Sequence, residues 1–268
     1  MINKKLPILG FSLFAYLGLF VCSSTSGLAF AQEVSVSRQE RLAALLTSGN
    51  DEQKLDAVID MGALLSVNSH ATPQTVSILG SLLQSDSSPI IRALAARSME
   101  LSRDERCAPV LLSVLKTEQE PEVRRAVIYA LAYQHSPEVV ETLLPLLKYK
   151  KQDIRAAAAF ALAELGVSAS MNAFIDLLRK RGSEEDAFAR KQAVRGLGKI
   201  GDPVAIDVLL TVLNRDKSSE VRREAVLSLG RIAKAQDVKV IEALKLVTLQ
   251  SDPYLAALAT SALEKLRL

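Results

Sequence analysis

Residues 153–166 read DIRAAAAFALAELG, and residues 220–230 read EVRREAVLSLG. Each segment opens with an acidic, an aliphatic and a basic residue, and small or aliphatic residues then recur at steps of three and four. This spacing places the apolar side chains on one face of a helix with 3.6 residues per turn. The two segments therefore predict two copies of one amphipathic helix.

That helix recurs seven times along the chain. The copies start at positions 53, 91, 123, 154, 189, 221 and 255, and their second residue is basic except at Ala256. Other amphipathic segments separate them, at 73–84, 108–116, 137–148, 169–180, 203–214 and 237–249. A repeat of this length is typical of solenoids, in which each helical hairpin stacks only on its neighbours. We therefore predict an all-α fold, an α-solenoid (superhelix) of about seven helical hairpins.

Capping residues mark several predicted helix starts. A side-chain oxygen precedes proline at Thr72, Ser136 and Asp202. Such an oxygen accepts a hydrogen bond from a backbone N–H of the first helical turn. A proline at the first helical position costs no hydrogen bond, because the N–H there has no partner within the helix. Residues 37–40 form an S-x-x-E pattern, which predicts a capping box at the start of the first helix.

The repeats resemble HEAT repeats of the phycobilisome-lyase-like subclass. The motifs that carry the resemblance are EVRRA at 122–126, the two segments quoted above, and LGKIGDP at 197–203. The resemblance covers nearly all of the chain after residue 31. It implies the solenoid architecture, but HEAT repeats serve scaffolds, adaptors, transport factors and a few enzymes, so it specifies function weakly.

The N-terminus has the layout of a secretory signal peptide. Two lysines at 4–5 precede an apolar run at 6–22, and the small-residue pattern at 29–31 precedes Gln32. We expect a signal peptide at 1–31, a HEAT-repeat domain at 32–268, and a periplasmic or extracellular location. An uncleaved membrane anchor and lipidation at Cys22 are the alternatives.

Charge and composition exclude several functions. After loss of the two lysines the chain has 31 basic and 30 acidic residues, without the cationic excess that nucleic acids require. Only His70 and His135 occur, in no zinc motif, and the iron-binding His-Glu pairs of HEAT-repeat hydroxylases are absent. Cys107 has no disulfide partner in the mature chain and no histidine base in a recognisable motif. We therefore expect no metal, no cofactor and no catalysis.

The recurring basic residue is interpreted as structural. It occupies positions 54, 92, 124, 155, 190 and 222. A residue needed to build every repeat recurs, whereas a residue needed for one ligand does not. We expect these side chains to form a ladder between repeats with acidic residues near the helix junctions, namely Asp86, Glu120, Asp153, Asp186 and Asp216.

The recurring helices also predict a binding surface. Counting each aligned start as step zero, steps 2, 6 and 10 lie opposite the core face, and in HEAT-like stacks they line the concave side. The predicted partner-binding residues are Arg125, Tyr129, Tyr133, Phe160, Lys191, Arg195, Lys199, Arg223, Leu227 and Arg231, with Ala156 and Glu164 on the same stripe. Interfaces favour tyrosine and arginine, so we expect a protein or peptide, acidic with apolar anchors. A merely solvated helix face is the alternative, and the loop at 179–186 is a second candidate surface.

The sequence alone thus favours an exported, non-catalytic scaffold or adaptor. One alternative is a subunit of the bilin-lyase type, against which the predicted signal peptide counts, because that chemistry belongs with cytosolic phycobiliproteins. A self-assembling structural component of the envelope is the other. The identity of the partner and the oligomeric state stay open.

Overall fold

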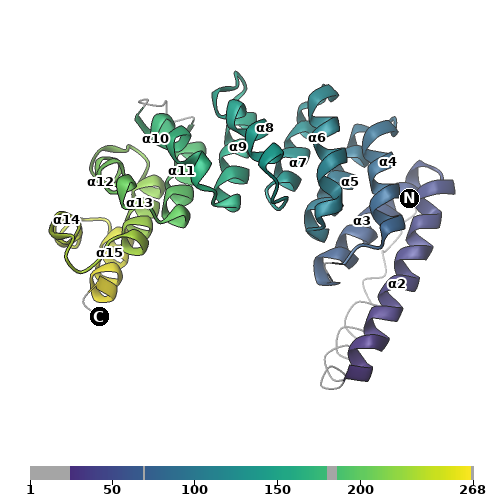
Figure 1. Ribbon diagram of the computed structural model, residues 1–268, viewed down its shortest axis with the longest axis horizontal. Coiled ribbons are helices and arrows are strands. Elements are labelled where there is room, and N and C mark those ends of the chain that lie inside the picture. The colour runs from purple at the N-terminus through teal and green to yellow at the C-terminus, as the bar shows by residue number, and fades with distance from the viewer. Residues whose placement is uncertain (1–24, 69, 180–185, 267–268) are drawn as a thin grey trace, which may run out of the picture.

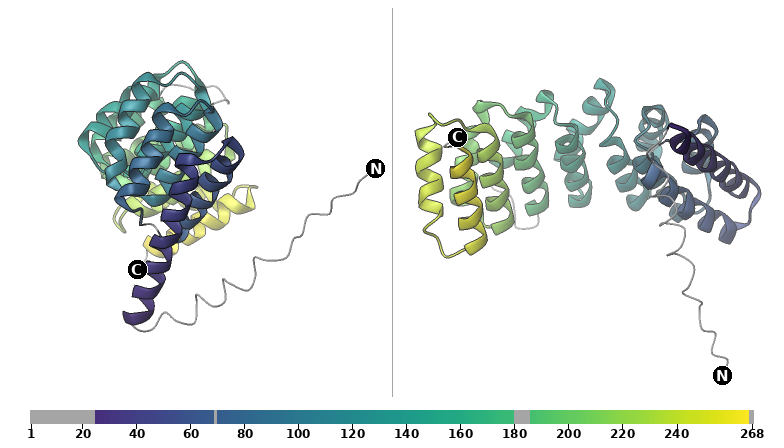
Figure 2. Two further views of the ribbon diagram at one scale, coloured as in Figure 1. Left: turned by 90° about the vertical axis from the view of Figure 1, so that its right-hand side faces the viewer. Right: turned by 90° about the horizontal axis from the view of Figure 1, so that it is seen from below.

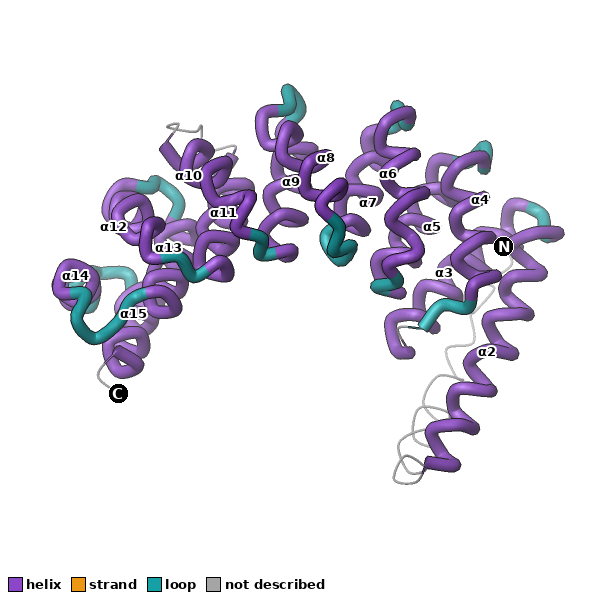
Figure 3. Tube along the Cα trace, viewed as in Figure 1, coloured by secondary structure: helices purple, strands orange, loops and turns teal. Residues whose placement is uncertain are grey.

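The structure, a computed structural model, describes residues 25–68, 70–179 and 186–266, and every regular element in these ranges is a helix (Figure 3). The helices form consecutive pairs: α2 (Thr25–Ser48) with α3 (Asp51–Asn68), α4 (Pro73–Ser85) with α5 (Pro89–Ser102), α6 (Ala108–Thr117) with α7 (Pro121–Leu131), α8 (Pro137–Leu143) with α9 (Gln152–Leu165), α10 (Met171–Arg179) with α11 (Ala187–Ile200), α12 (Ile206–Arg215) with α13 (Ser219–Ile232), and α14 (Val238–Val247) with α15 (Pro253–Leu266). Short 3-10 turns precede α6, α10 and α12 (Glu105–Cys107, Ser168–Ser170, Pro203–Ala205), and another continues α8 (Leu144–Lys148). The predicted all-α solenoid of helical hairpins is confirmed.

The hairpins follow one another along an arch (Figures 1 and 2). We call the first helix of each pair the A helix and the second the B helix. The B helices α3 to α15 line the inside of the arch, and the A helices from α4 to α14 form its outer side (Figure 1). The helix α2 extends past the body of the stack at one end (Figures 1 and 2).

One continuous core runs between the two layers and from repeat to repeat. Small residues allow the helices to approach closely. In α9, Ala157, Ala158 and Ala159 are completely buried. At Gly196 an added Cβ atom would lie 2.4 Å from the ring of Phe174, so only glycine fits this contact between α10 and α11. Because the core passes through every repeat, each helical hairpin buries its apolar face against the neighbouring hairpins.

The predicted caps at three A helices are present. Thr72 accepts a hydrogen bond from the amide of Thr75, Ser136 from that of Val139, and Asp202 from that of Val204. In each case a proline begins the helix or turn. The junctions between repeats are therefore specified locally by the sequence.

Three predicted boundaries were wrong. Ser37 does not begin a helix, because α2 starts at Thr25 and the Ser37 hydroxyl donates to the carbonyl of Val34 within it. The A helix predicted at 137–148 changes to a 3-10 turn at Leu144, where Pro145 has no amide to continue the α-helical pattern. The helix α7 ends at Leu131, so Tyr133 lies in the following turn.

The predicted signal peptide at 1–31 lies largely outside the described residues, as do residues 180–185 of the 179–186 loop. The proposed junction between residues 31 and 32 falls inside α2. Among the described helices, none combines the length and the apolar character that a membrane span requires.

Candidate partner-binding surface

Most of the recurring basic residues join neighbouring repeats, whereas the contacts of Arg222 are with carbonyls in the turn of its own hairpin. Arg155 donates to the carbonyls of Tyr149 and Lys150 at 2.8 and 2.9 Å and to the carboxylate of Asp186 at 2.6 Å. It therefore binds both the A–B turn before it and the next repeat. The other ladder contacts are Lys54 with Asp86, Arg92 with Glu118 and the Asp86 carbonyl, Arg124 with the carbonyls of Leu115 and Glu118, Arg190 with Asp216, and Arg222 with the carbonyls of Asp216 and Lys217.

The acidic partners follow the prediction in part. Asp86, Asp186 and Asp216 lie in the ladder as expected. Arg92 pairs with Glu118, not with Glu120, because Glu118 is the C-cap residue of α6 and so stands where α4 and α12 have aspartates. The Asp153 side chain instead accepts the amide of Ile154. The contact with Arg92 helps to lower the pKa of Glu118 against the opposing effect of burial, which favours a charged ladder at neutral pH.

The predicted stripe faces the inside of the arch. The A helices cover the outer side of each B helix and neighbouring B helices cover its flanks, so its open side is the inner one (Figure 1). In α7 the residues at steps 0, 4 and 8 are buried, while Arg125 and Tyr129 are partly exposed. We call the ten predicted partner-binding residues the concave floor.

The aromatic residues of the floor form a half-buried cluster. The rings of Tyr129 and Phe160 meet edge to face, with centroids 5.2 Å apart. The Arg103 guanidinium lies over the ring of Tyr133, 4.7 Å from its centroid. Burial raises the pKa of the Tyr129 and Tyr133 hydroxyls, so both stay neutral near pH 7. All three rings also pack against the core, which corrects the expectation that they stand free of it.

The cations of the floor are paired, which the sequence analysis did not predict. Lys191 contacts Glu220 at 2.8 Å, and Arg195 and Lys199 contact Glu164 at 3.0 and 2.7 Å. The remaining pairs are Arg125 with Glu122, Arg223 with Asp252, and Arg231 with Glu224. The cationic part of the floor is therefore a set of ion pairs interrupted by Leu227, and it offers a partner little uncompensated positive charge.

The inner side of the arch also holds residues beyond the ten of the concave floor, at the same steps of other B helices. The same steps in α3 hold Leu55, Ile59 and Ala63, and Ile59 is 50% exposed. In α5 they hold Arg97 and Leu101. Applying one helical count to all seven B helices would have found them. The N-terminal half of this inner side is thus largely apolar, and the C-terminal half is charged.

Few groups in the described ranges are suited to nucleophilic or metal chemistry. No cluster of three or more His, Cys, Asp or Glu side chains there could hold a metal ion. Cys107 is completely buried beside Ser102, and burial raises the pKa of its thiol to about 11. A buried neutral thiol is a poor nucleophile, so Cys107 is a packing residue.

Cavities lie on the other side of the arch, between successive A helices. One of about 510 Å³ lies between α6 and α8, one of about 860 Å³ between α8 and α10, and one of about 580 Å³ between α10 and α12. Their position follows from the curvature, because the inner B helices pack closely and the outer A helices diverge.

Comparison with known proteins agrees with the repeat architecture. The family model for HEAT repeats matches residues 39–132, 108–187 and 175–264. The chain is 31% identical over 121 residues to a phycocyanobilin lyase subunit beta of Thermosynechococcus vestitus, covering 45% of this chain and 54% of that subunit. It is 31% identical over 150 residues to a phycobilisome maturation protein of Synechococcus elongatus, covering 51% of this chain and 70% of that protein. An X-ray structure of an Escherichia coli protein shares the fold, with a TM-score of 0.52 and 19% identity over 88% of this chain and 96% of that one.

These relatives contradict the expected function and location. A non-catalytic scaffold was predicted, whereas two related sequences are lyase subunits. Export was predicted from the N-terminal pattern, and the relatives, two phycocyanobilin lyase subunits and a phycobilisome maturation protein, contradict it. Of the two alternatives, the relatives favour the subunit of the bilin-lyase type.

Proposed function

Because this chain belongs to the HEAT-repeat family, in its phycobilisome-lyase-like subclass, we propose that it is a lyase-type subunit that acts on a bilin and on the protein that accepts it. The observation that carries the proposal is the sequence match to two phycocyanobilin lyase subunits and to a phycobilisome maturation protein. The alignment spans about half the length of the lyase subunits, so their activity is transferred here as a proposal.

The concave floor is the proposed docking surface for the protein partner. Tyr129, Tyr133 and Phe160 supply aromatic contact area, and aromatic side chains with arginines carry much of the energy of protein interfaces. Their half-buried position holds them in one arrangement before binding, which reduces the entropy lost on association. Acidic groups of a partner would have to compete with Glu164 and Glu220 for the cations, so apolar contacts contribute more than charge.

The proposed contribution to the reaction is positioning. The floor would hold the acceptor protein while the bilin is brought to its attachment site, and holding two reactants in a suitable geometry can itself lower a barrier substantially. No proton-transfer role is assigned to a side chain of the floor.

Co-expression tests this function. The chain is produced with a bilin-synthesising pathway and an acceptor phycobiliprotein, with and without the companion subunit of a related lyase. Covalently bound pigment is then measured by zinc-induced fluorescence of the acceptor on a denaturing gel. We expect pigment on the acceptor only when this chain is present. Equal pigment without the chain in both arms would refute the proposal.

A further inference from the structure

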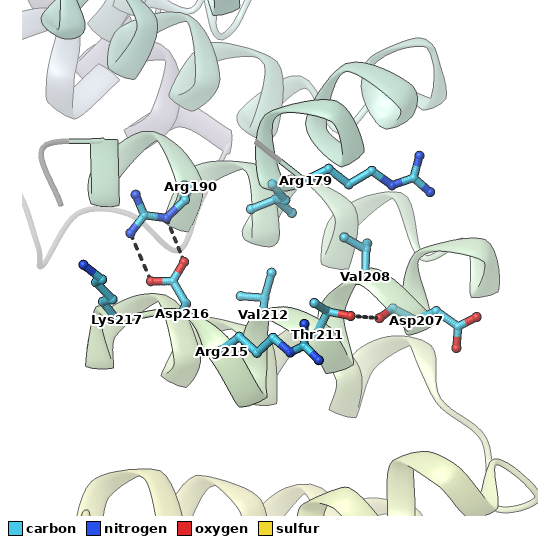
Figure 4. A pocket seen from close by; sticks show the side chains of 10 residues that line it. Arg179, Arg190, Asp207, Val208, Thr211, Val212, Arg215, Asp216 and Lys217 are labelled. Carbon is cyan, nitrogen blue, oxygen red and sulfur yellow. Dashed lines mark hydrogen bonds and ion pairs between the residues drawn. The ribbon is translucent and has the colours of Figure 1, made fainter. Parts of the chain in front are cut away.

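The groove between α10 and α12 combines an apolar floor with a cationic rim (Figure 4). Leu178, Val208 and Val212 form apolar parts of its lining, and its volume is about 580 Å³. Binding sites for small molecules are typically 300–1,000 Å³ and largely apolar with a few well-placed polar groups. The groove has the size and the mixed character of such a site.

The rim carries more positive than negative charge. Four cationic side chains and two carboxylates line the groove. One pair is internally satisfied, because Arg190 donates to both oxygens of Asp216 at 2.7 and 3.0 Å. The other three cations, Arg179, Arg215 and Lys217, are exposed, and their side chains contact no hydrogen-bond acceptor or carboxylate among the described residues (Figure 4).

The architecture alone does not produce this charge. The equivalent groove between α6 and α8 pairs its one lysine, Lys116, with Glu138 at 3.8 Å and adds Glu105. The groove between α8 and α10 balances three cations with three carboxylates. The groove recurs from repeat to repeat, and its cationic excess does not.

Helix ends explain only part of the excess. Arg179 and Arg215 lie in the last turns of α10 and α12, where a cation interacts favourably with the helix dipole. The residue directly before the C-cap, however, is Ser85 in α4 and Thr117 in α6, so Arg215 is not required to end an A helix. Lys217 lies beyond the helix altogether.

We propose that this groove binds an open-chain tetrapyrrole through its two propionate carboxylates. The guanidinium groups of Arg179 and Arg215 bind the carboxylates, since the planar guanidinium fork matches a carboxylate in a bidentate manner. The pyrrole rings cover Leu178, Val208 and Val212. This inference rests on the proposed function, from which the bilin comes, and it adds a holding site separate from the concave floor.

Titration with biliverdin, a tetrapyrrole with two free propionates, tests the site. Absorbance changes of biliverdin report its Kd for the full chain. The double variant Arg179→Gln, Arg215→Gln should weaken binding at least tenfold. Both side chains are exposed and contact no acceptor in the part of the chain that the structure describes, so the fold should be retained, which circular dichroism checks. The matched control Lys239→Gln, Lys245→Gln removes two exposed cations of α14 outside the groove and should leave Kd within twofold. Biliverdin dimethyl ester should bind at least tenfold more weakly than the diacid.

Two results would overturn the inference: a Kd unchanged by the double variant, or equal affinity for the ester. Loss of binding on Tyr133→Ala alone would place the pigment on the concave floor instead. The proposed function is tested separately by co-expression. Pigment can become attached to the acceptor even if biliverdin does not bind in the groove, and that result would refute the site but not the function. Conversely, biliverdin that binds in the groove of a chain that attaches no pigment would leave the site standing and remove the lyase role.

Discussion

Arg155 shows how one side chain joins two repeats. Replacement by alanine removes donors from the exposed carbonyls of Tyr149 and Lys150 and from the partly buried carboxylate of Asp186. We expect Arg155→Ala to lower the free energy of unfolding by about 1–3 kcal/mol. Urea unfolding measures this loss. The control Arg231→Ala breaks a 3.7 Å pair on an exposed side chain and should cost well under 1 kcal/mol. Equal losses in the two variants would contradict the structural role of the ladder.

Tyr129 packs against its neighbours, and a binding role is proposed for it. Because its ring contacts Phe160 and the core, Tyr129→Ala should cost about 2 kcal/mol, below the 3–5 kcal/mol of a fully buried large aromatic. Its hydroxyl bonds to no described residue, so Tyr129→Phe should change stability by less than about 0.5 kcal/mol. Thermal unfolding of both variants distinguishes the two contributions. A stability loss on Tyr129→Phe as large as that on Tyr129→Ala would show that the ring contacts are misassigned.

Cys107 should be unreactive in the folded protein. Burial raises its thiol pKa to about 11, so almost no thiolate exists at pH 8. Iodoacetamide labelling of the Cys107 peptide, followed by mass spectrometry, should be slow in buffer and fast in 8 M urea. Because the pKa of the Cys107 thiol is higher in the folded than in the unfolded chain, the protonated thiol stabilises the fold at neutral pH. This contribution to stability is lost as the pH rises from about 9 to about 11. Rapid labelling at pH 8 without urea would be inconsistent with this burial.

Glu164 connects α9 to α11 on the concave side. Its carboxylate accepts contacts from both Arg195 and Lys199, and its side chain is only 15% exposed. We expect Glu164→Gln to reduce stability by about 1 kcal/mol at low ionic strength, with a smaller loss in 1 M NaCl, where such pairs are screened. Urea titrations at both salt concentrations measure this difference. A loss independent of salt would mean that Glu164 contributes by packing and not by charge.

The elements show which features a sequence can predict. Helix starts at Thr72, Ser136 and Asp202 were predicted because a cap acts on an amide two or three residues away. The ladder of basic residues between repeats was predicted because a basic residue recurs at the same position of six B helices. The ion pairs of Lys191, Arg195, Lys199 and Arg223 were missed because their partners lie 29 to 35 residues away and meet only when helices stack. The pairs of Arg125 and Arg231 lie within one helix, where the sequence spacing could have shown them. The break at Leu144 was missed because the apolar pattern of the segment continues past Pro145.

The whole molecule has two sides of different shape. Stacking of the B helices forms a smooth inner floor, and divergence of the A helices opens grooves on the outer side (Figure 1). Its function could not be deduced from the fold, because the same architecture serves unrelated activities. The N-terminal pattern predicts an exported scaffold, whereas the related sequences support the lyase-type function that the repeat resemblance implies.

Attachment kinetics test the central claim most directly. Purified chain, bilin and acceptor protein, together with a companion lyase subunit, are mixed, and the rate of covalent pigmentation is measured against acceptor concentration. The account predicts a saturable acceleration that requires this chain, and a KM for the acceptor raised at least tenfold by Tyr133→Ala, with kcat nearly unchanged. A rate that is the same with and without the chain would contradict the proposed function.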